Sequence, residues 1–360
     1  MVLFITRKFP PSKGGMQRAA FELSRDLSQI TQVKLIKSGG SNKWLPFVLP
    51  WLFFRGLWSL LTEKIQVIYL QDGLLAPLGV IFKLLTRKPV VITLHGRDIT
   101  YSLRLYQFVI IRCLQRMDKI ICVSQAIKEA CCNRGIKAEK TAVIANGISD
   151  EFYVSTEKSK LRAELADRLK TDLSERKILL TVGRFVAKKG IHWFVEEVMP
   201  QLADNNLVYI IAGSGVLEPV IRKSIVRHNL QNDVYLVGLA DDDMLRLLYN
   251  AADIFVMPNI PVEDDMEGFG LVALETSSCG LPVVASDLEG ISDVVKDGSN
   301  GFLVEPANPQ GFINRINELL GDDEALRAFG EHARQYTLEN YGWDKMAREY
   351  AKEFQRLTEA

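Results

Sequence analysis

The chain has 360 residues, of which 48% are apolar and 24% charged, and its formal net charge at pH 7 is zero. This length and near-average composition favour two globular domains, each large enough for its own core, and exclude long disordered segments. The 5 cysteines lack CxxC spacing, which argues against both a disulfide framework and a zinc site.

Charge is distributed unevenly along the chain. Residues 1–150 contain 22 Lys and Arg against 9 Asp and Glu, a net charge of +13, and the remaining residues carry −13. A basic half is typical of a surface that meets nucleic acid or anionic lipid, although attraction between two oppositely charged halves explains it equally well. We find no nucleic-acid-binding motif and expect no nucleic-acid partner. No signal peptide is visible, so we expect an intracellular protein.

Short runs rich in Val and Ile alternate with helical patterns along the chain. The alternation predicts two parallel sheets wrapped by helices, divided near the charged, strandless stretch 155–176. Ligands of such doubly wound sheets bind at the carboxyl ends of the strands. The predicted strands are VLFIT (2–6), VKLIK (33–37), VIYL (67–70), VVITL (90–94), KIICVS (119–124), TAVIANG (141–147), KILLTVG (177–183), LVYIIAG (207–213), DVYLVG (233–238), IFVMP (254–258), LPVVAS (281–286) and GFLV (301–304).

The segment 44–61, WLPFVLPWLFFRGLWSLL, is the most hydrophobic part of the chain. Pro46, Pro50, Arg55 and Gly56 interrupt it well short of the roughly 20 uninterrupted apolar residues that a membrane-spanning helix needs. Its tryptophans, with Lys43 and Arg55, suit a helix lying in the lipid headgroup layer. An ordinary helix buried against a sheet is the alternative. Together with the basic first half, the headgroup interpretation predicts peripheral attachment at the inner face of the cytoplasmic membrane.

In the first predicted domain, two strand ends carry residues suited to a ligand. Gly14 and Gly15 lie between the first strand and a helix, in a turn that tolerates an anion. His95 follows the strand VVITL and precedes a glycine. A lone histidine is more often structural, but this position at the functional edge of the sheet favours catalysis or sugar binding.

In the second domain, the loop GRFVAKKG places Arg184 and Lys189 after a strand, where a diphosphate needs neutralising cations. The glycine-containing turns after the next two strands, at 213–215 and 238–239, offer backbone against which a nucleotide base can lie. Because GSG lacks the third glycine of a dinucleotide fingerprint, an oxidoreductase is poorly supported.

The stretch 267–280, EGFGLVALETSSCG, places two carboxylates around a helix start. Gly268 and Gly270 allow close backbone approach, and a helix beginning near Gly270 points N–H groups and a positive dipole end at a ligand, which suits a phosphate. Glu267 stays on the loop, whereas Glu275 lies roughly 8 Å along the helix. A nucleotide sugar, with hydroxyls at both ends and phosphates in the middle, matches this layout. The alternative is an acidic helix cap with a solvated glutamate.

Two carboxylate runs raise the question of a metal. Asp241–Asp243 directly precede a helix, whose N-terminus explains acidic residues there. Asp264 and Asp265 form the second run. Because two side-chain cations are available to neutralise a leaving diphosphate, we predict no metal and no cofactor.

Together these segments resemble the retaining glycosyltransferases of family 4, also called glycosyl transferases group 1, which have the GT-B fold. The resemblance covers nearly the whole chain, and the spacing of Glu267 and Glu275 is its most specific element. It is carried by GGMQRAAFELS, TLHGRD, VSQAIKE, IANGIS, VGRFVAKKG, IIAGSG, YNAADIFVMP, EGFGLVALE, CGLPVVASDLEGISDVV and DGSNGFLV.

The resemblance implies an α/β protein of two facing Rossmann-like, doubly wound domains. Residues 1–154 would form the acceptor-binding domain, completed by a C-terminal helix 343–360 that crosses back to it. Residues 155–342 would bind the nucleotide sugar. One departure is the acidic segment NIPVEDDMEGFG, 259–270, where a shorter one is common, so the donor-sugar preference is open.

The resemblance also implies roles for single residues. Arg184 and Lys189 would bind the donor diphosphate, and Glu275 the ribose hydroxyls. Glu267 would hold the donor sugar, and His95 would lie beside the reacting carbon. These four residues, His95, Arg184, Lys189 and Glu267, are the predicted catalytic residues. The predicted donor-binding residues are Gly14, Gly15, Arg184, Lys189, Gly213, Gly215, Gly238, Leu239, Glu267, Gly268, Phe269, Gly270, Leu271, Val272 and Glu275.

The predicted function is a metal-independent retaining hexosyltransferase that acts in polysaccharide or glycolipid biosynthesis. UDP-glucose is the preferred donor, followed by GDP-mannose, and the acceptor is a hydroxyl of a saccharide or lipid-linked saccharide. A sugar-nucleotide epimerase is an alternative, but it needs further acid and base residues near the anomeric carbon. A non-enzymatic scaffold would bind the donor without turnover.

Overall fold

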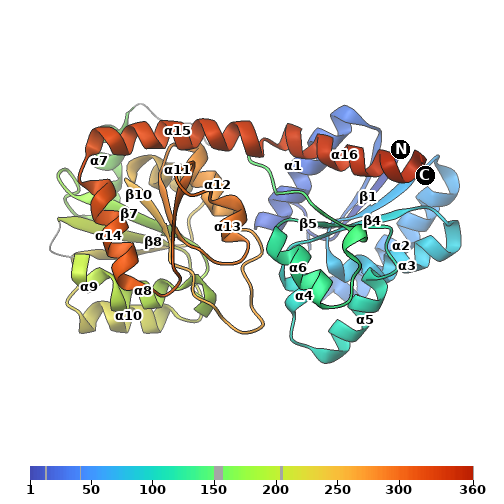
Figure 1. The fold of residues 1–360 in the computed structure, drawn as a ribbon, viewed down its shortest axis with the longest axis horizontal. Helices are drawn as coiled ribbons and strands as arrows, with labels where there is room; N and C mark the ends of the chain where they lie inside the picture. The colour runs from blue at the N-terminus through green and yellow to red at the C-terminus, as the bar shows by residue number, and fades with distance from the viewer. Residues whose placement is uncertain (13, 41, 150–156, 203–205, 360) are drawn as a thin grey trace. The chain divides into compact units, whose positions relative to one another are not determined.

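The computed structural model describes residues 1–360 except 13, 41, 150–156, 203–205 and 360 (Figure 1). The chain forms two compact units. Unit 1 consists of Met1–Ser149, Asp264–Phe269 and Tyr341–Ala360, and unit 2 of Asp150–Glu263 and Gly270–Asn340. The boundary predicted between residues 154 and 155 lies outside the described residues.

Unit 1 is built on a parallel sheet of 6 strands in the order β2-β1-β3-β4-β5-β6. Since β1 pairs with both β2 and β3, the strand order reverses there, and the crevice at the carboxyl ends of β1 and β3 is the expected ligand position. The strands are β1 (Val2–Thr6), β2 (Val33–Lys37), β3 (Val67–Leu70), β4 (Val90–Leu94), β5 (Lys119–Cys122) and β6 (Thr141–Val143).

The last helix of the chain, α16 (Trp343–Glu359), packs on the sheet of unit 1 beside α1 (Gly15–Ile30). Its amphipathic pattern has the expected consequence: Trp343, Met346, Tyr350 and Phe354 are buried in the core that also contains β1 and β3. The predicted return of the terminal helix to the first domain is therefore confirmed. The other helices of unit 1 are η1 (Asn42–Trp44), α2 (Leu45–Thr62), η2 (Gly73–Leu75), α3 (Ala76–Thr86), α4 (Arg97–Thr100), α5 (Arg104–Leu114), α6 (Gln125–Asn133) and η3 (Ala138–Lys140).

The tryptophan-rich segment forms one helix, α2, of 18 residues, with Pro50 inside it. Neither proline breaks the helix, because Pro46 lies in the first turn, where a missing N–H costs nothing, and the helix continues past Pro50. By length and composition alone α2 could cross a membrane, and 22% of it is buried in the protein. Its inward face includes Gly56, where a Cβ atom would lie 2.7 Å from Phe82 Cζ.

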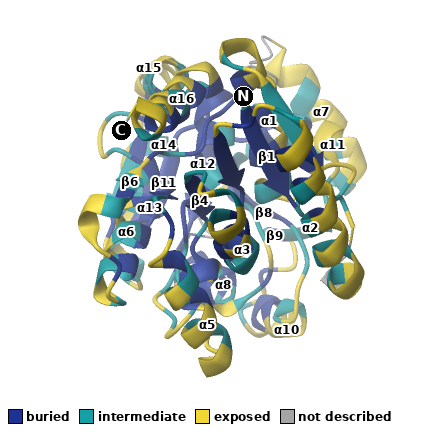
Figure 2. Ribbon diagram, turned by 90° about the vertical axis from the view of Figure 1, so that its right-hand side faces the viewer, coloured by how far each residue is buried: buried dark blue, intermediate teal, exposed yellow. Residues whose placement is uncertain are grey.

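The outward face of α2 carries a stripe of exposed apolar side chains, and Figure 2 shows its outer edge as exposed. The stripe repeats every three or four residues, which is the spacing of one helix face. Burial against the sheet therefore explains only the inner face of this helix. The stripe consists of Phe47, Trp51, Phe54, Trp58 and Leu61, whose exposed fractions range from 46% to 73%.

Unit 2 contains a second parallel sheet of 6 strands, in the order β12-β11-β10-β7-β8-β9. This is the order of dinucleotide-binding folds, and the reversal lies between β7 and β10. All twelve predicted strands are present, and the prediction of two parallel sheets is confirmed. The strands are β7 (Lys177–Val182), β8 (Leu207–Ala212), β9 (Val234–Gly238), β10 (Ile254–Met257), β11 (Val283–Ser286) and β12 (Gly301–Val304).

The core of unit 2 lies between this sheet and the surrounding helices, with Phe194, Tyr209 and Phe312 fully buried. The rings of Phe194 and Phe312 pack edge to face, with centroids 5.7 Å apart. The helices are α7 (Lys158–Leu169), η4 (Ala187–Lys189), α8 (Ile191–Glu197), α9 (Met199–Leu202), α10 (Glu218–Arg227), α11 (Asp242–Ala251), α12 (Leu271–Ser278), α13 (Ile291–Val294), α14 (Pro309–Leu320) and α15 (Asp323–Tyr341).

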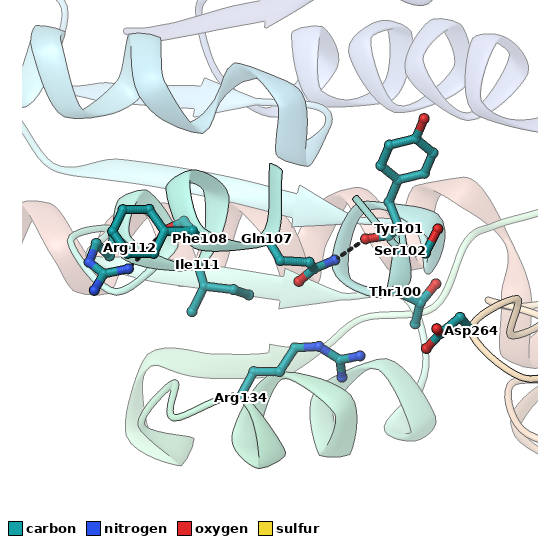
Figure 3. A pocket seen from close by; sticks show the side chains of 9 residues that line it. All are labelled: Thr100, Tyr101, Ser102, Gln107, Phe108, Ile111, Arg112, Arg134 and Asp264. Carbon is teal, nitrogen blue, oxygen red and sulfur yellow. Dashed lines mark hydrogen bonds between the residues drawn. The ribbon is translucent and has the colours of Figure 1, made fainter. Parts of the chain in front are cut away.

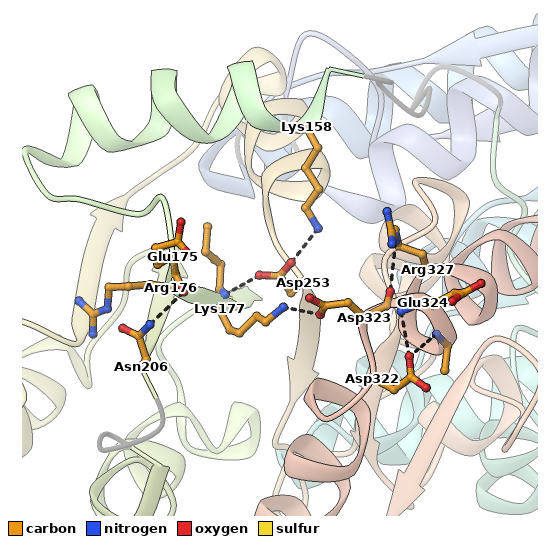
Figure 4. A network of polar contacts seen from close by, with 12 residues as sticks. Lys158, Glu175, Arg176, Lys177, Asn206, Asp253, Asp322, Asp323, Glu324 and Arg327 are labelled. Carbon is orange, nitrogen blue, oxygen red and sulfur yellow. Dashed lines mark hydrogen bonds and ion pairs between the residues drawn. The ribbon is translucent and has the colours of Figure 1, made fainter.

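A polar network ties the amino ends of β7 and β10 to α7 (Figure 4). Asp253, buried just before β10, accepts hydrogen bonds from Lys158 at 2.8 Å, Arg162 at 3.0 Å and the Ile178 N–H at 2.7 Å. Burial raises the pKa of Asp253, but these partners outweigh it and hold the pKa below its ordinary value. The network thus fixes the sheet at the edge opposite to its carboxyl ends.

Candidate functional site

The carboxyl edge of the unit 1 sheet holds a buried ion pair at the strand reversal. Arg7 follows β1 and Asp72 follows β3, and Arg7 Nε donates to Asp72 Oδ1 at 3.0 Å. The Asp72 side chain is fully buried, and its Oδ1 also accepts from the Leu74 N–H at 3.0 Å. A buried polar group needs such hydrogen-bond partners to offset its loss of hydration.

His95, at the end of β4, is fixed from two sides. Its Nε2 lies 2.9 Å from the carbonyl oxygen of Gln71, and because a carbonyl only accepts, Nε2 carries the proton. Its backbone N–H donates to Asp98 Oδ2 at 2.9 Å. Burial lowers the pKa of His95. The imidazole is therefore neutral at pH 7, with Nδ1 as its acceptor atom.

Asp98 is the most perturbed carboxyl group of this edge. Burial, followed by the nearby charge of Asp72, raises its pKa to about 7, against an ordinary 3.8. Burial and a nearby like charge both disfavour the ionised form of a carboxyl group. The Asp98 carboxyl group therefore keeps its proton up to near-neutral pH.

Two glycines bring the segment 264–269 onto this edge. A Cβ atom on Gly268 would lie 2.2 Å from the carbonyl oxygen of His95, and one on Gly96 would lie 2.9 Å from Gly268 Cα. Gly96 also has a φ of +106°, which glycine alone adopts easily. Glu267, the predicted sugar ligand, directly precedes Gly268 and is therefore attached to a residue that packs on the backbone of His95.

Gly14 and Gly15 lie at the start of α1, after β1. Both are exposed, and Gly14 caps the helix with a φ of +141° and no side-chain hydrogen bond to the first turn. The first N–H groups of α1 thus have no side-chain acceptor in the cap, which suits an anion as predicted.

In unit 2, the loop after β7 is attached to the end of β10. Gly190, with a φ of +64°, packs so closely that a Cβ atom there would lie 1.6 Å from the carbonyl oxygen of Pro258. The N–H of Ile260 donates to the Lys188 carbonyl oxygen at 3.1 Å. Arg184 is exposed on this loop, and the Lys189 side chain runs past Gly183, 3.9 Å from where its Cβ would lie. Both predicted cations therefore lie at the strand reversal of the unit 2 sheet.

The glycines of the next loop have a structural explanation. Gly213 and Gly215 pack on the backbone of the β7 loop, where added Cβ atoms would lie 1.8 Å from the Gly183 carbonyl oxygen and 2.5 Å from that of Phe185. Gly238, with a φ of +72°, has open space around its Cβ position. Leu239 is 81% exposed.

Helix α12 follows the long loop after β10. Gly270 caps it with a φ of +85° and no side-chain hydrogen bond, so the N–H groups of the first turn, including those of Leu271 and Val272, are not capped by a side chain. Glu275 lies in the second turn, and its Oε2 accepts from the Tyr249 hydroxyl at 2.9 Å. The predicted helix start and the place of Glu275 on it are both found.

The acidic run before α11 has the structural role that the sequence indicated. Asp241 Oδ1 accepts from the Met244 N–H at 2.9 Å and so caps the helix, while Asp242 and Asp243 occupy its first turn. Asp264 is exposed, with a φ of +58°.

The predicted site residues thus fall into two groups, and their roles in catalysis and donor binding stay predictions. Sequence reasoning missed Arg7, Gln71, Asp72 and Asp98, although an acid after strand VIYL and another in HGRD were visible signals. Unit 1 contains Gly14, Gly15, His95, Glu267, Gly268 and Phe269, and unit 2 contains Arg184, Lys189, Gly213, Gly215, Gly238, Leu239, Gly270, Leu271, Val272 and Glu275.

Two doubly wound parallel sheets, each with glycine-containing turns at its carboxyl edge, define the class of GT-B proteins. Comparison with known families agrees with this class: residues 13–152 match the model of Glycosyltransferase Family 4, and residues 165–336 that of Glycosyl transferases group 1. The chain belongs to family 4 of the GT-B glycosyltransferases and is a transferase enzyme.

Relatives and solved structures agree with this assignment. An uncharacterized glycosyltransferase of Methanocaldococcus jannaschii is 28% identical over 84% of this chain and 80% of its own. HepE of Anabaena, solved with UDP and glucose, has a TM-score of 0.78 at 21% identity, over 98% and 99% of the two chains. The catalytic domain of starch synthase IV from Arabidopsis thaliana, bound to ADP and acarbose, has a TM-score of 0.81 at 16% identity, over 100% and 99%. At these identities the two structures establish the shared fold.

Proposed function

We propose that this glycosyltransferase moves a hexose from a nucleotide diphosphate sugar to a hydroxyl of a saccharide or lipid-linked saccharide, with retention of the anomeric configuration. UDP-glucose is the first candidate donor and GDP-mannose the second. The observation that carries the proposal is the strand reversal of unit 2, where the loop of Arg184 and Lys189 is attached to the end of β10. That reversal is where doubly wound sheets bind nucleotides.

The leaving diphosphate would be stabilised by fixed positive groups. Arg184 and Lys189 supply two cations, and α12 begins at a glycine, without a side-chain cap. Such groups act on charge that develops as the sugar–phosphate bond breaks, which makes them effective in the transition state. With these cations in place, we propose that transfer requires no metal ion.

Glu275 and His95 complete the proposed roles. Glu275 would hold the ribose hydroxyls, with its carboxylate already oriented by the Tyr249 hydroxyl at 2.9 Å. His95 would contact the donor sugar near the reacting carbon, as a neutral ring fixed by Gln71. The departing phosphate oxygen would accept the proton of the attacking hydroxyl on the same face of the sugar.

We further propose that the enzyme binds the inner face of the cytoplasmic membrane through the apolar stripe of α2. The stripe lies in the basic part of the chain, where residues 1–150 carry a net charge of +13. Exposed Arg55 on α2 and Arg87 at the end of the neighbouring α3 add positive charge beside the apolar side chains. This combination of exposed tryptophan and cations is typical of helices that lie in the headgroup layer.

A donor screen tests the proposed function. The melting temperature of the protein would be measured with UDP-glucose, GDP-mannose and ADP-glucose, and release of the nucleotide diphosphate would be followed in parallel. We expect the largest rise in melting temperature with UDP-glucose, the first candidate donor. A ligand present at about 100 times its Kd stabilises the folded protein by roughly 2.7 kcal/mol. Stabilisation without any release in the presence of acceptors would favour the scaffold alternative, and no stabilisation by any donor would contradict the proposal.

A further inference from the structure

Unit 1 contains a cavity of about 420 Å³ that none of the predicted site residues lines (Figure 3). Its walls come from the loop between α4 and α5, from α5 itself, from the end of α6 and from Asp264. Asp264 belongs to the acidic segment that departs from the family pattern. The cavity therefore combines an unusual segment of this chain with the acceptor-binding unit.

Two arginines, Arg112 and Arg134, line this cavity. Arg112 donates to the Phe108 carbonyl oxygen at 3.3 Å, and its guanidinium lies 3.5 Å from the centre of the Phe108 ring. Arg134 donates to the Ala130 carbonyl oxygen, one turn back on its own helix, at 3.1 Å. Among the described residues neither guanidinium forms an ion pair, so most of their N–H groups remain available to an anion.

The end of the cavity that contains Arg112 lies on an apolar helix face. On α5, Leu105, Phe108 and Val109 have exposed fractions of 70%, 56% and 39%, and their spacing puts them on one side of the helix. Helix α3, which packs against α5, adds exposed Leu84 and Leu85. Since α3 also packs against α2, this face continues toward the proposed membrane-binding stripe.

The other end of the cavity is polar and close to His95. Figure 3 shows Thr100, Ser102 and Asp264 at this end, opposite Arg112 and Phe108, with Arg134 between the two groups. Hydroxyl and carboxylate oxygens of this kind bind sugar hydroxyls. Helix α4 joins this end to the predicted reaction site, because the Thr100 hydroxyl donates to the carbonyl oxygen of Gly96, the residue after His95, at 3.4 Å.

The geometry points to a specific acceptor: we propose that this cavity binds a phosphate group that connects the acceptor saccharide to an apolar chain. Arg134 holds the phosphate in the middle of the cavity, the apolar chain lies along α5 past Phe108 and Arg112, and the saccharide extends past Thr100 and Asp264 toward His95. This inference rests on the proposed function and names the class of its acceptor. It also gives Asp264 a role, because its carboxylate contacts hydroxyls of the saccharide rather than the anion.

Direct binding of farnesyl phosphate, a soluble phosphate with an apolar chain, tests the inference without any donor. We expect binding to the wild-type protein, a loss of about tenfold or more for Arg134→Gln, which removes a charge-assisted contact to the phosphate, and a smaller loss for Arg112→Gln, which removes a positive charge farther along the cavity. Asp264→Asn should bind a few-fold more tightly because a like charge is removed, and asparagine tolerates the positive φ at this position. Opposite effects of these variants are not expected from simple unfolding.

Arg116→Gln is the matched control, because Arg116 is an exposed arginine just after α5 that does not line the cavity. Equal binding of farnesyl phosphate to wild type and to both cavity variants would overturn the inference. If inorganic phosphate binds as tightly as farnesyl phosphate, the apolar chain has no part and the acceptor is a soluble phosphate. Farnesol, which lacks the phosphate group, should not compete with farnesyl phosphate for the cavity. Donor binding is measured separately. A negative result with farnesyl phosphate would therefore overturn the acceptor inference without changing the result of the donor screen.

Discussion

Asp98 links the protonation of the unit 1 edge to the stability of the protein. Its pKa is about 7 in the folded protein, whereas an unperturbed aspartate titrates near 3.8. The folded state therefore binds more protons than the unfolded state between these values. The stabilising contribution of the protonated group is complete below about pH 4 and is lost as the pH rises to about 7.

Asp98→Asn should remove this pH dependence. Asparagine still offers an oxygen to the His95 N–H but does not ionise, so the free energy of unfolding should decline less between pH 4 and 7 than in the wild type. The difference should reach on the order of a few kcal/mol. Urea unfolding at several pH values checks this, with Glu129→Gln on the surface of α6 as the control. Parallel profiles for wild type and Asp98→Asn would show that Asp98 is ionised throughout.

The proposed catalysis depends on the positive charges of Lys189 and Arg184. Replacing either by alanine should lower kcat/KM by the equivalent of roughly 2 to 4 kcal/mol, because a contact to the developing diphosphate charge is lost. Folding should survive, since Arg184 is exposed and Lys189 only half-buried. Steady-state kinetics on the donor identified by the screen measure the effect, and Lys223→Ala, an exposed lysine on α10, is the control. Wild-type activity in both variants would remove these cations from the mechanism.

At the scale of elements, the strands were predictable because buried parallel strands are continuous Val- and Ile-rich runs bounded by turns. Helix α2 was less predictable. The sequence shows that this helix is hydrophobic, but it does not show which face packs inward. The close approach of Gly56 to Phe82 identifies the inward face, and it is visible only in the structure. Phe53, which lies between Trp51 and Phe54 in the sequence, does not belong to the exposed stripe, because it stacks on Phe82 at a centroid distance of 5.7 Å.

The stripe of α2 should therefore be tested without Phe53. The protein should sediment with vesicles that contain anionic phospholipid, and high salt should release it. Replacing Trp51, Phe54 and Trp58 by serine should reduce binding at least about tenfold, because three exposed apolar side chains no longer enter the lipid. Val220→Ser with Val226→Ser, exposed apolar positions of α10 in unit 2, is the control. Unchanged binding by the triple variant would place the membrane contact elsewhere or nowhere.

At the scale of the whole molecule, sequence reasoning identified which loops carry the site but not how those loops are held. Strand ends at a sheet reversal are predictable from order alone. The attachment of Gly268 to the backbone of His95, and of Gly190 to Pro258, depends on approaches of backbone to backbone that no periodicity indicates. The buried pair of Arg7 and Asp72 joins residues 65 positions apart, which a single sequence does not reveal.

The central claim is metal-independent transfer of a hexose with retention, and the anomeric configuration of the first product tests it most directly. The enzyme would be incubated with UDP-glucose and excess EDTA, with and without vesicles that contain lipid-linked saccharides, while proton NMR follows the anomeric signals and UDP release. We predict that UDP appears together with a new α-linked glucoside, or with α-glucose when water is the acceptor, at a rate that EDTA does not change. A β-configured first product, activity that EDTA abolishes and Mg²⁺ restores, or no UDP release under any of these conditions would contradict the account.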